Sequence, residues 1–76
     1  MNVMWDVPIE DVRAGDVWTS NETRVEVDVV GPNPDPRWRG AIRITGRIIK
    51  GYGTSMKVHT WSFWPGHKMD IERKAR

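Results

Sequence analysis

The chain has 76 residues, no cysteine and a formal net charge of +2 at pH 7. A chain of this length has room for one hydrophobic core, so residues 1–76 are expected to form a single domain. Without cysteine there is no disulfide or thiolate-held zinc, and packing must stabilise the domain. Each of the five tryptophans can bury roughly 150–250 Å², so their first expected role is to form the core.

No stretch of the sequence reaches the ~18 apolar residues of a membrane span, and the first residues lack the pattern of a signal peptide. The sequence therefore predicts a cytoplasmic protein with no membrane partner.

Charge is divided unevenly along the chain. Residues 1–36 carry eight carboxylates and two arginines, a net charge of −6, whereas residues 37–76 carry ten basic and two acidic side chains, a net charge of +8. Such asymmetry is typical of a protein with an electrostatic partner. An equally open interpretation is that the halves are neighbouring strands whose charges neutralise one another across a sheet.

The first half of the chain predicts short strands. Residues 7–9 are expected to be extended, residues 10–14 to make one helical turn ended by Gly15, and residues 17–19 to form a strand. Polar residues 20–22 predict a turn into an alternating, half-buried strand. Its inward face would carry Val25, Val27 and Val29, and its outward face Arg24, Glu26 and Asp28.

Residues 31–36 contain three prolines in alternate positions, which predict an exposed loop that neither extends a strand nor enters a helix. Residues 38–50 alternate again and predict a basic strand. Gly40 and Gly46 within it would permit the bulges or bends that a small sheet needs to close on itself. The inward face would carry Trp38, Ile42, Ile44 and Ile48, and the outward face Arg39, Arg43 and Arg47.

The remaining elements follow in quick succession. They are a hairpin turn at residues 51–53, a strand at 56–64, a type II turn at Pro65-Gly66, a strand at 68–72 with Met69 and Ile71 inward, and a frayed basic tail at 73–76. Together these elements predict a mainly β domain, a five- to six-stranded antiparallel barrel of SH3-like form with one short helical turn.

Residues 7–17, Val-Pro-Ile-Glu-Asp-Val-Arg-Ala-Gly-Asp-Val, followed by a strand with alternating valines, resemble the opening of small uncharacterised β-barrel proteins of actinobacteria and their phages. The resemblance covers about the first thirty residues and implies a fold, with no site residue. A phage origin would place the protein in the cytoplasm of the host and would favour a protein that binds nucleic acid or a host protein.

Side chains able to support catalysis lie close in sequence near residue 62. A nucleophile needs a base and an orienting group, which Ser62, His59, His67 and Asp70 could supply on paper. However, Ser62 lies within a strand pattern, with no strained elbow or Gly-rich oxyanion loop beside it. The histidines and Asp70 match no metal-binding spacing. The sequence therefore predicts a non-enzymatic protein without a metal or cofactor.

The meaning of the basic strand depends on the register of the hairpin that follows it. A two-residue turn places Ile44 opposite Trp61 and puts Trp61 and Phe63 in the core, which leaves a basic outer face without rings. A three-residue turn places Thr45 opposite Trp61 and Arg43 opposite Phe63, an arginine and aromatic platform suited to single-stranded nucleic acid. The need for a core in so small a domain favours the first register.

The leading hypothesis from these patterns is a non-catalytic small-barrel module that binds nucleic acid through its basic strand face. The alternative is a phage or accessory protein that binds a host protein, or self-associates, through an arginine- and tryptophan-rich patch, because these residue types are also enriched at protein hot spots. The candidate binding residues are Arg39, Arg43, Arg47, Lys50 and Lys57, with His59 or Trp64 at the edge.

Overall fold

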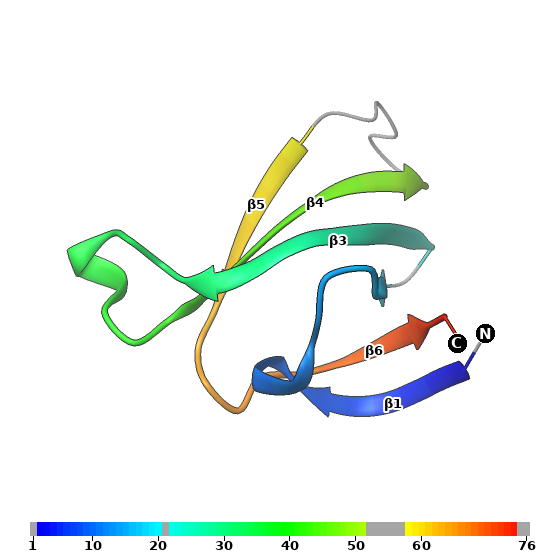
Figure 1. Ribbon diagram of the computed structural model, residues 1–76, viewed down its shortest axis with the longest axis horizontal. Coiled ribbons are helices and arrows are strands. Elements are labelled where there is room, and N and C mark those ends of the chain that lie inside the picture. Colours follow the sequence, from blue (N-terminus) through cyan, green and yellow to red (C-terminus); the bar gives the residue numbers. More distant parts are fainter. Residues whose placement is uncertain (1, 21, 52–57, 75–76) are drawn as a thin grey trace.

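The computed structural model describes residues 2–20, 22–51 and 58–74. These residues form one six-stranded antiparallel sheet with the strand order β1-β6-β2-β3-β4-β5 (Figure 1). The strands are β1 (Asn2–Pro8), β2 (Val17–Ser20), β3 (Thr23–Pro32), β4 (Ile42–Lys50), β5 (Val58–Phe63) and β6 (Lys68–Arg73), and two 3₁₀ turns are η1 (Ile9–Asp11) and η2 (Pro36–Trp38). No helix in these ranges is long and apolar enough to cross a membrane.

The prediction of a mainly β, antiparallel fold is confirmed. Closure into an SH3-like barrel stays a prediction, because β1 and β5 form the two ends of the strand order. Two elements of the first half differ from expectation. Residues 7 and 8 of the expected extended entry are the end of a seven-residue strand, β1. The third, Ile9, begins the helical turn, which starts one residue earlier than expected and spans three residues.

The hydrophobic core is formed by side chains of the sheet together with η1. Ile9 of η1 is fully buried, and its N–H donates to the carbonyl of His67 at 2.7 Å, which ties the turn to the start of β6. Met69 and Ile71 point inward from β6 as predicted. The buried cluster consists of Val7, Ile9, Val12, Val27, Ile44, Met69 and Ile71.

A β-bulge in β3 changes the predicted facing of one valine. The pairing with β4 shifts between Val27, opposite Gly46, and Val29, opposite Thr45, so Asp28 is an extra residue in β3. Because one added residue reverses the alternation of side chains, Val29 faces solvent and the next residue, Val30, packs against the core. The expectation that Val29 faces inward is wrong for this reason.

The glycine opposite the bulge is required by close packing. A Cβ on Gly46 would lie 2.4 Å from the carbonyl oxygen of Glu26 and 3.1 Å from a methyl carbon of Val25. The predicted role for a glycine at this point, accommodating a bulge, is confirmed, with the extra residue on β3 rather than on β4.

The tryptophans are divided between the core and the surface. Trp18 meets Trp61 and Phe63 edge to face, with ring centroids 5.6 and 5.3 Å apart, and these three rings pack against the buried cluster. Trp5, Trp38 and Trp64 are exposed. The expectation that the tryptophans serve the core first is therefore wrong for Trp5 and Trp38, whereas Trp64 was also a candidate binding residue.

The register between β4 and β5 is the one favoured by the demand for a core. Ile44 lies opposite Trp61, Ile42 opposite Phe63, and Arg43 opposite Ser62. Consequently the aromatic side chains of β5 are on the core side of the sheet, and the arginines of β4 are on the other side. The hairpin turn itself, the predicted start of the second strand and Lys57 lie outside the described residues.

The last described strand is firmly attached. Arg73, expected in a frayed tail, is the last residue of β6 and its guanidinium donates two hydrogen bonds of 2.9 Å to the buried carboxylate of Asp16. Asn2 of β1 lies opposite Arg73, so the two ends of the described chain lie together (Figure 1). The η2 turn lies at the opposite end of the molecule.

Candidate binding surface

The predicted binding residues are spread along β4 and do not converge on one site. Arg39 precedes the strand, Arg43 is its second residue, and Lys50 is its last. A nine-residue strand is about 26 Å long, so Arg39 and Lys50 lie at opposite ends. His59 is in β5 and Trp64 immediately follows it.

Arg47 is neutralised by the acidic half of the chain. Its guanidinium donates to Glu26 at 2.8 Å and to Asp28 at 3.3 Å, and the bulge at Asp28 is what brings the second carboxylate to the same arginine. Its Nε atom is buried and has no hydrogen-bond partner in the described chain, while 35% of the whole side chain stays exposed. For these strands the predicted neutralisation of neighbouring charges holds.

The outer face of β4 is consequently only weakly basic. Arg43 and Arg47 are matched in number by Glu26 and Asp28, and between the arginines lies Thr45. Arg43 has no ion pair within residues 2–20, 22–51 and 58–74. The stripe of three arginines expected from the alternation therefore reduces to one unpaired cation on this face, with Arg39 beyond the end of the strand.

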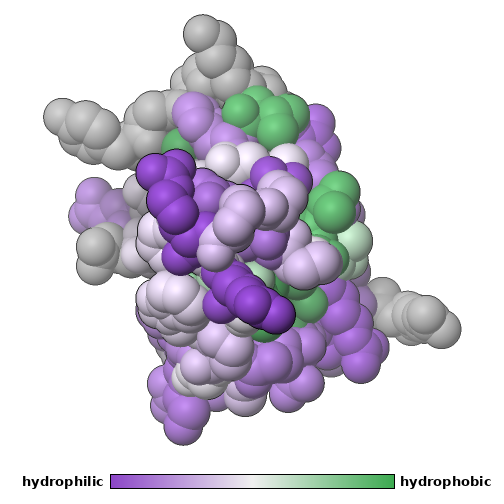
Figure 2. Space-filling view, turned by 90° about the vertical axis from the view of Figure 1, so that its left-hand side faces the viewer, coloured by the Kyte–Doolittle hydropathy of each residue, from purple (hydrophilic) through white to green (hydrophobic). Residues whose placement is uncertain are grey.

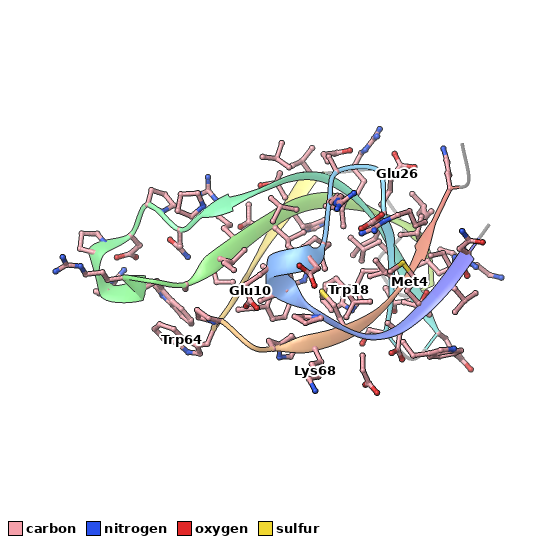
Figure 3. All side chains as sticks on the ribbon, turned by 60° about the horizontal axis from the view of Figure 1, so that its bottom comes forward. Met4, Glu10, Trp18, Glu26, Trp64 and Lys68 are labelled. Carbon is pink, nitrogen blue, oxygen red and sulfur yellow. The ribbon has the colours of Figure 1, made fainter. Side chains whose placement is uncertain are left out.

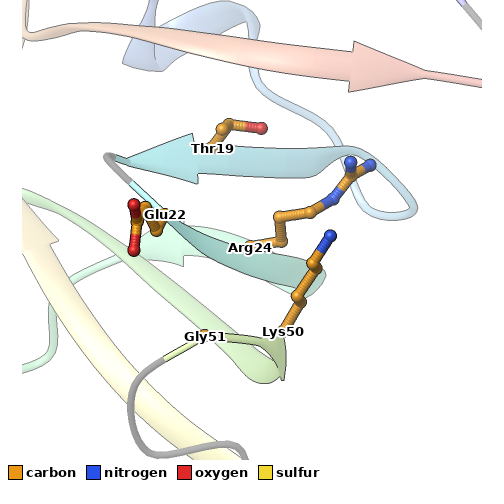
Figure 4. Close-up of a pocket in the computed structure, with 5 residues that line it drawn as sticks. All are labelled: Thr19, Glu22, Arg24, Lys50 and Gly51. Carbon is orange, nitrogen blue, oxygen red and sulfur yellow. The ribbon is translucent and has the colours of Figure 1, made fainter.

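Lys50 lies in a separate hollow at the far end of β4, lined by Thr19, Glu22, Arg24 and Gly51 (Figure 4). Arg24 is directly opposite Lys50 in the sheet and forms an ion pair with Glu72 of β6. This hollow is at the opposite end of β4 from Arg39.

The Pro-rich connection between β3 and β4 is an ordered loop. Its sequence was expected to exclude both strand and helix, but β3 extends to Pro32 and Pro36 begins η2. Proline is suitable at both places, because its N–H is not needed at a strand end or in the first turn of a helix.

Side chains of the loop hold it in place. Asn33 accepts from the N–H of Asp35 at 2.9 Å and donates its amide to the Ser62 hydroxyl at 2.6 Å, which anchors the loop to β5. The Asp35 carboxylate caps η2 by accepting from the N–H of Arg37 at 2.9 Å, and it also binds the Arg37 guanidinium at 3.0 Å. These hydrogen bonds lower the pKa of Asp35. The loop thereby presents Trp38 in a defined position.

Trp38 and Trp64 stack on one another at the surface. Their ring centroids are 5.4 Å apart with an interplanar angle of 24°, and the residues are 38% and 53% exposed. Trp64 is fixed by the turn that follows it, because the His67 N–H donates to its carbonyl at 3.1 Å and Gly66 has a φ of +87°. The turn predicted at Pro65-Gly66 is confirmed. Figure 3 shows Trp64 beside the hairpin that contains η2.

Two arginines flank the stacked tryptophans. Arg37 is held by Asp35, with its side chain 87% exposed, and Arg39 is exposed with no ion pair in the described part of the chain. We call the set formed by Arg37, Trp38, Arg39 and Trp64 the Arg–Trp surface. Figure 2 looks onto this end of the molecule, where strongly hydrophilic side chains stand among residues of intermediate hydropathy and apolar side chains form only separate spots.

Sequence reasoning found half of this surface. Arg39 and Trp64 were predicted as binding residues, whereas Arg37 was not singled out and Trp38 was assigned to the core. The strand was expected to begin at Trp38, but it begins at Ile42, after a tight turn in which Gly40 has a φ of +89°. The three prolines immediately before Arg37-Trp38-Arg39 were the available signal that this tripeptide belongs to the loop.

The side chains considered for catalysis have other partners. The Ser62 hydroxyl accepts from Asn33, His59 and His67 lie against Trp61 and Phe63 respectively, and the Asp70 carboxylate accepts from the N–H of Asp6. Among the residues that the structure describes, no three histidine, aspartate or glutamate side chains gather as metal ligands would. Comparison with protein-family models, curated proteins and solved structures finds no match to the chain.

Proposed function

We propose that this protein is a non-catalytic binding module and that it binds another protein through the Arg–Trp surface. The observation that carries this proposal is the exposed, stacked pair of Trp38 and Trp64. Tryptophan and arginine are the residues most enriched at the energetic centres of protein interfaces. Two large rings exposed to water add less to the stability of a small domain than they would in its core. Their exposure therefore points to a role in binding.

Rigidity of the surface supports the same proposal. Trp38 is positioned by the loop hydrogen bonds of Asn33 and Asp35, and Trp64 by the turn at Gly66. A surface that is already ordered loses little conformational entropy on binding, which favours affinity from a small contact area. Arg39, which follows Trp38 in the chain, and Arg43 form no ion pair within the described residues, so an acidic partner surface is the best electrostatic match.

Nucleic acid is the second candidate partner. It is favoured by the same unpaired Arg39 and Arg43, since a base stacks on an exposed tryptophan while a cation binds the phosphate. Two features disfavour it: Arg47 is already neutralised, and the aromatic side chains of β5 face the core rather than the arginines. Binding of this kind would weaken steeply with salt.

Trp64→Ala tests the proposal, with Trp5→Ala as its matched control, because Trp5 is 71% exposed on β1 at the other end of the strand order. The partner is first captured by the wild-type protein from lysate treated with nuclease, and its affinity is then measured with purified components. Loss of a hot-spot tryptophan should weaken binding by about 30-fold, equivalent to about 2 kcal/mol, whereas Trp5→Ala should leave it unchanged.

The opposite result distinguishes the two candidates. If nuclease abolishes capture, and Arg39→Glu removes the binding of a single-stranded oligonucleotide at low salt, the partner is nucleic acid. Equal losses for Trp64→Ala and Trp5→Ala would show that the Arg–Trp surface is not the binding site.

A further inference from the structure

The β5 strand forms an open edge of the sheet. Its hydrogen-bonded neighbour is β4, and it is the last strand in the order, with no strand on its other side in the described chain. Its six residues, Val-His-Thr-Trp-Ser-Phe, include no proline and no lysine, arginine, aspartate or glutamate. All six of its pairs with β4 keep one register without a bulge. The unpaired N–H and C=O groups of an edge strand can bind a further strand, unless a proline, a charged side chain or a bulge prevents it.

The opposite edge of the same sheet is blocked. In β1 the pairing with β6 shifts between Met4 and Val7, where Asp6 has a φ of +53°, and the strand ends in Pro8. A bulge, a charged side chain and a proline are the usual devices that prevent strand addition. Within the described chain, therefore, β5 is the edge of the sheet that is regular and unblocked.

We propose that β5 pairs antiparallel with β5 of a second copy of this chain, about a two-fold axis that passes beside Thr60. A two-fold axis perpendicular to the sheet places residues of the same face opposite one another. With Thr60 opposite Thr60 of the second copy, Val58 lies opposite Ser62. This register covers Val58, which is 62% exposed on the outer face, whereas an axis at Trp61 would leave it uncovered.

The lack of charge on β5 is the reason to infer a second copy of this chain as the strand that pairs with it. The strand is neutral, so it selects no charged segment, and two identical neutral strands do not repel each other. On the outer face the two arginines of β4 are matched by Glu26 and Asp28, so the faces that become continuous are close to neutral as well. The residues paired about this axis, 58–62, include none of the Arg–Trp surface, so the inference does not rest on the proposed function.

A single cysteine distinguishes this register. Because the chain has no cysteine, Thr60→Cys introduces one thiol that would lie about 5 Å, Cα to Cα, from its copy, within reach of a disulfide. Val58→Cys is the matched control on the same face, since its two copies would lie about 13 Å apart. Under mild oxidation Thr60→Cys should form covalent dimer at least about tenfold faster than Val58→Cys. Equal rates would overturn the proposal.

A second pair of variants needs no oxidation. Thr60→Lys places two lysines opposite each other at the edge, and Val29→Lys places one on the same outer face two strands away. Sedimentation equilibrium up to millimolar protein should show a weak dimer, since a strand-edge contact is small. Thr60→Lys should weaken that dimer about tenfold or more, and Val29→Lys should not. A wild-type chain that stays monomeric, or equal loss in both variants, contradicts the proposal.

Discussion

Replacing Asp16 by Asn would measure how much one buried ion pair contributes to stability. Asp16 is 2% exposed and is the only buried charged side chain in the ranges the structure describes. Its carboxylate accepts from Nε and Nη2 of Arg73 and from the N–H of Arg13, each at 2.9 Å. It thus joins the segment before β2 to the last residue of β6.

The magnitude follows from these contacts. Breaking a buried ion pair costs about 3–5 kcal/mol, because the remaining charge stays desolvated. The side chain of Arg73 is 27% exposed, and Asn keeps one acceptor oxygen, so about 2–3 kcal/mol is expected. For a domain of this size that loss lowers the melting temperature by about 10–20 °C.

The effect should depend on pH. Burial raises the pKa of Asp16, but hydrogen bonds from Arg73 and Arg13, and the charges of both guanidinium groups, outweigh burial and hold the pKa below its ordinary value of 3.8. A lowered pKa in the folded state means that the stabilisation is complete above the ordinary value and is lost as the pH falls through the folded value. The difference between wild type and Asp16→Asn should therefore shrink below about pH 4.

The assay is thermal unfolding followed by circular dichroism from pH 7 down to pH 3. Asp35→Asn is the control, because Asp35 forms its ion pair with the highly exposed Arg37, and its melting temperature should barely change. Equal stability of wild type and Asp16→Asn at pH 7, or a difference that is the same at pH 7 and pH 3, would refute this reasoning.

Two further predictions concern β3, β4 and the loop that joins them. Gly46→Ala should destabilise the fold by about 1–3 kcal/mol through overpacking, because its Cβ would lie 2.4 Å from the Glu26 carbonyl, whereas Gly31→Ala meets nothing within 4 Å; urea unfolding of both variants measures the contrast, and equal losses would contradict it. Arg39→Gln should weaken partner binding while Arg47→Gln should not, since Arg47 is already bound by Glu26 and Asp28. Titration calorimetry with the purified partner checks this, and a larger loss for Arg47→Gln would restore the basic strand face as the binding site.

The antiparallel fold could be predicted from the sequence because its signals are local. Alternation identified the inward residues of β4 and β6, and the need to bury Trp61 and Phe63 selected the correct register of β5. Each of these inferences compares residues a few positions apart, where the two-residue period of a strand is decisive.

Features that depend on distant contacts could not be predicted in this way. The bulge at Asp28 exists because β4 approaches at Gly46, and no pattern within β3 announces it. Trp38 follows the alternation of β4, yet the hydrogen bonds of the Pro-rich loop and its stacking on Trp64 remove it from the strand. The Arg–Trp surface could be predicted only in part because its residues come from two loops. These are the β3–β4 loop and the β5–β6 loop, which are separated in the sequence by β4 and β5.

The pairing of β1 with β6 also determines how this domain can be combined with others. Asn2 lies opposite Arg73, and η2 projects at the far end of the molecule (Figure 1). A short peptide joining the two ends would permit circular permutation, with new termini opened in a connecting loop. For the same reason the domain could be inserted into a loop of a larger protein, entering and leaving at one point while the Arg–Trp surface faces outward.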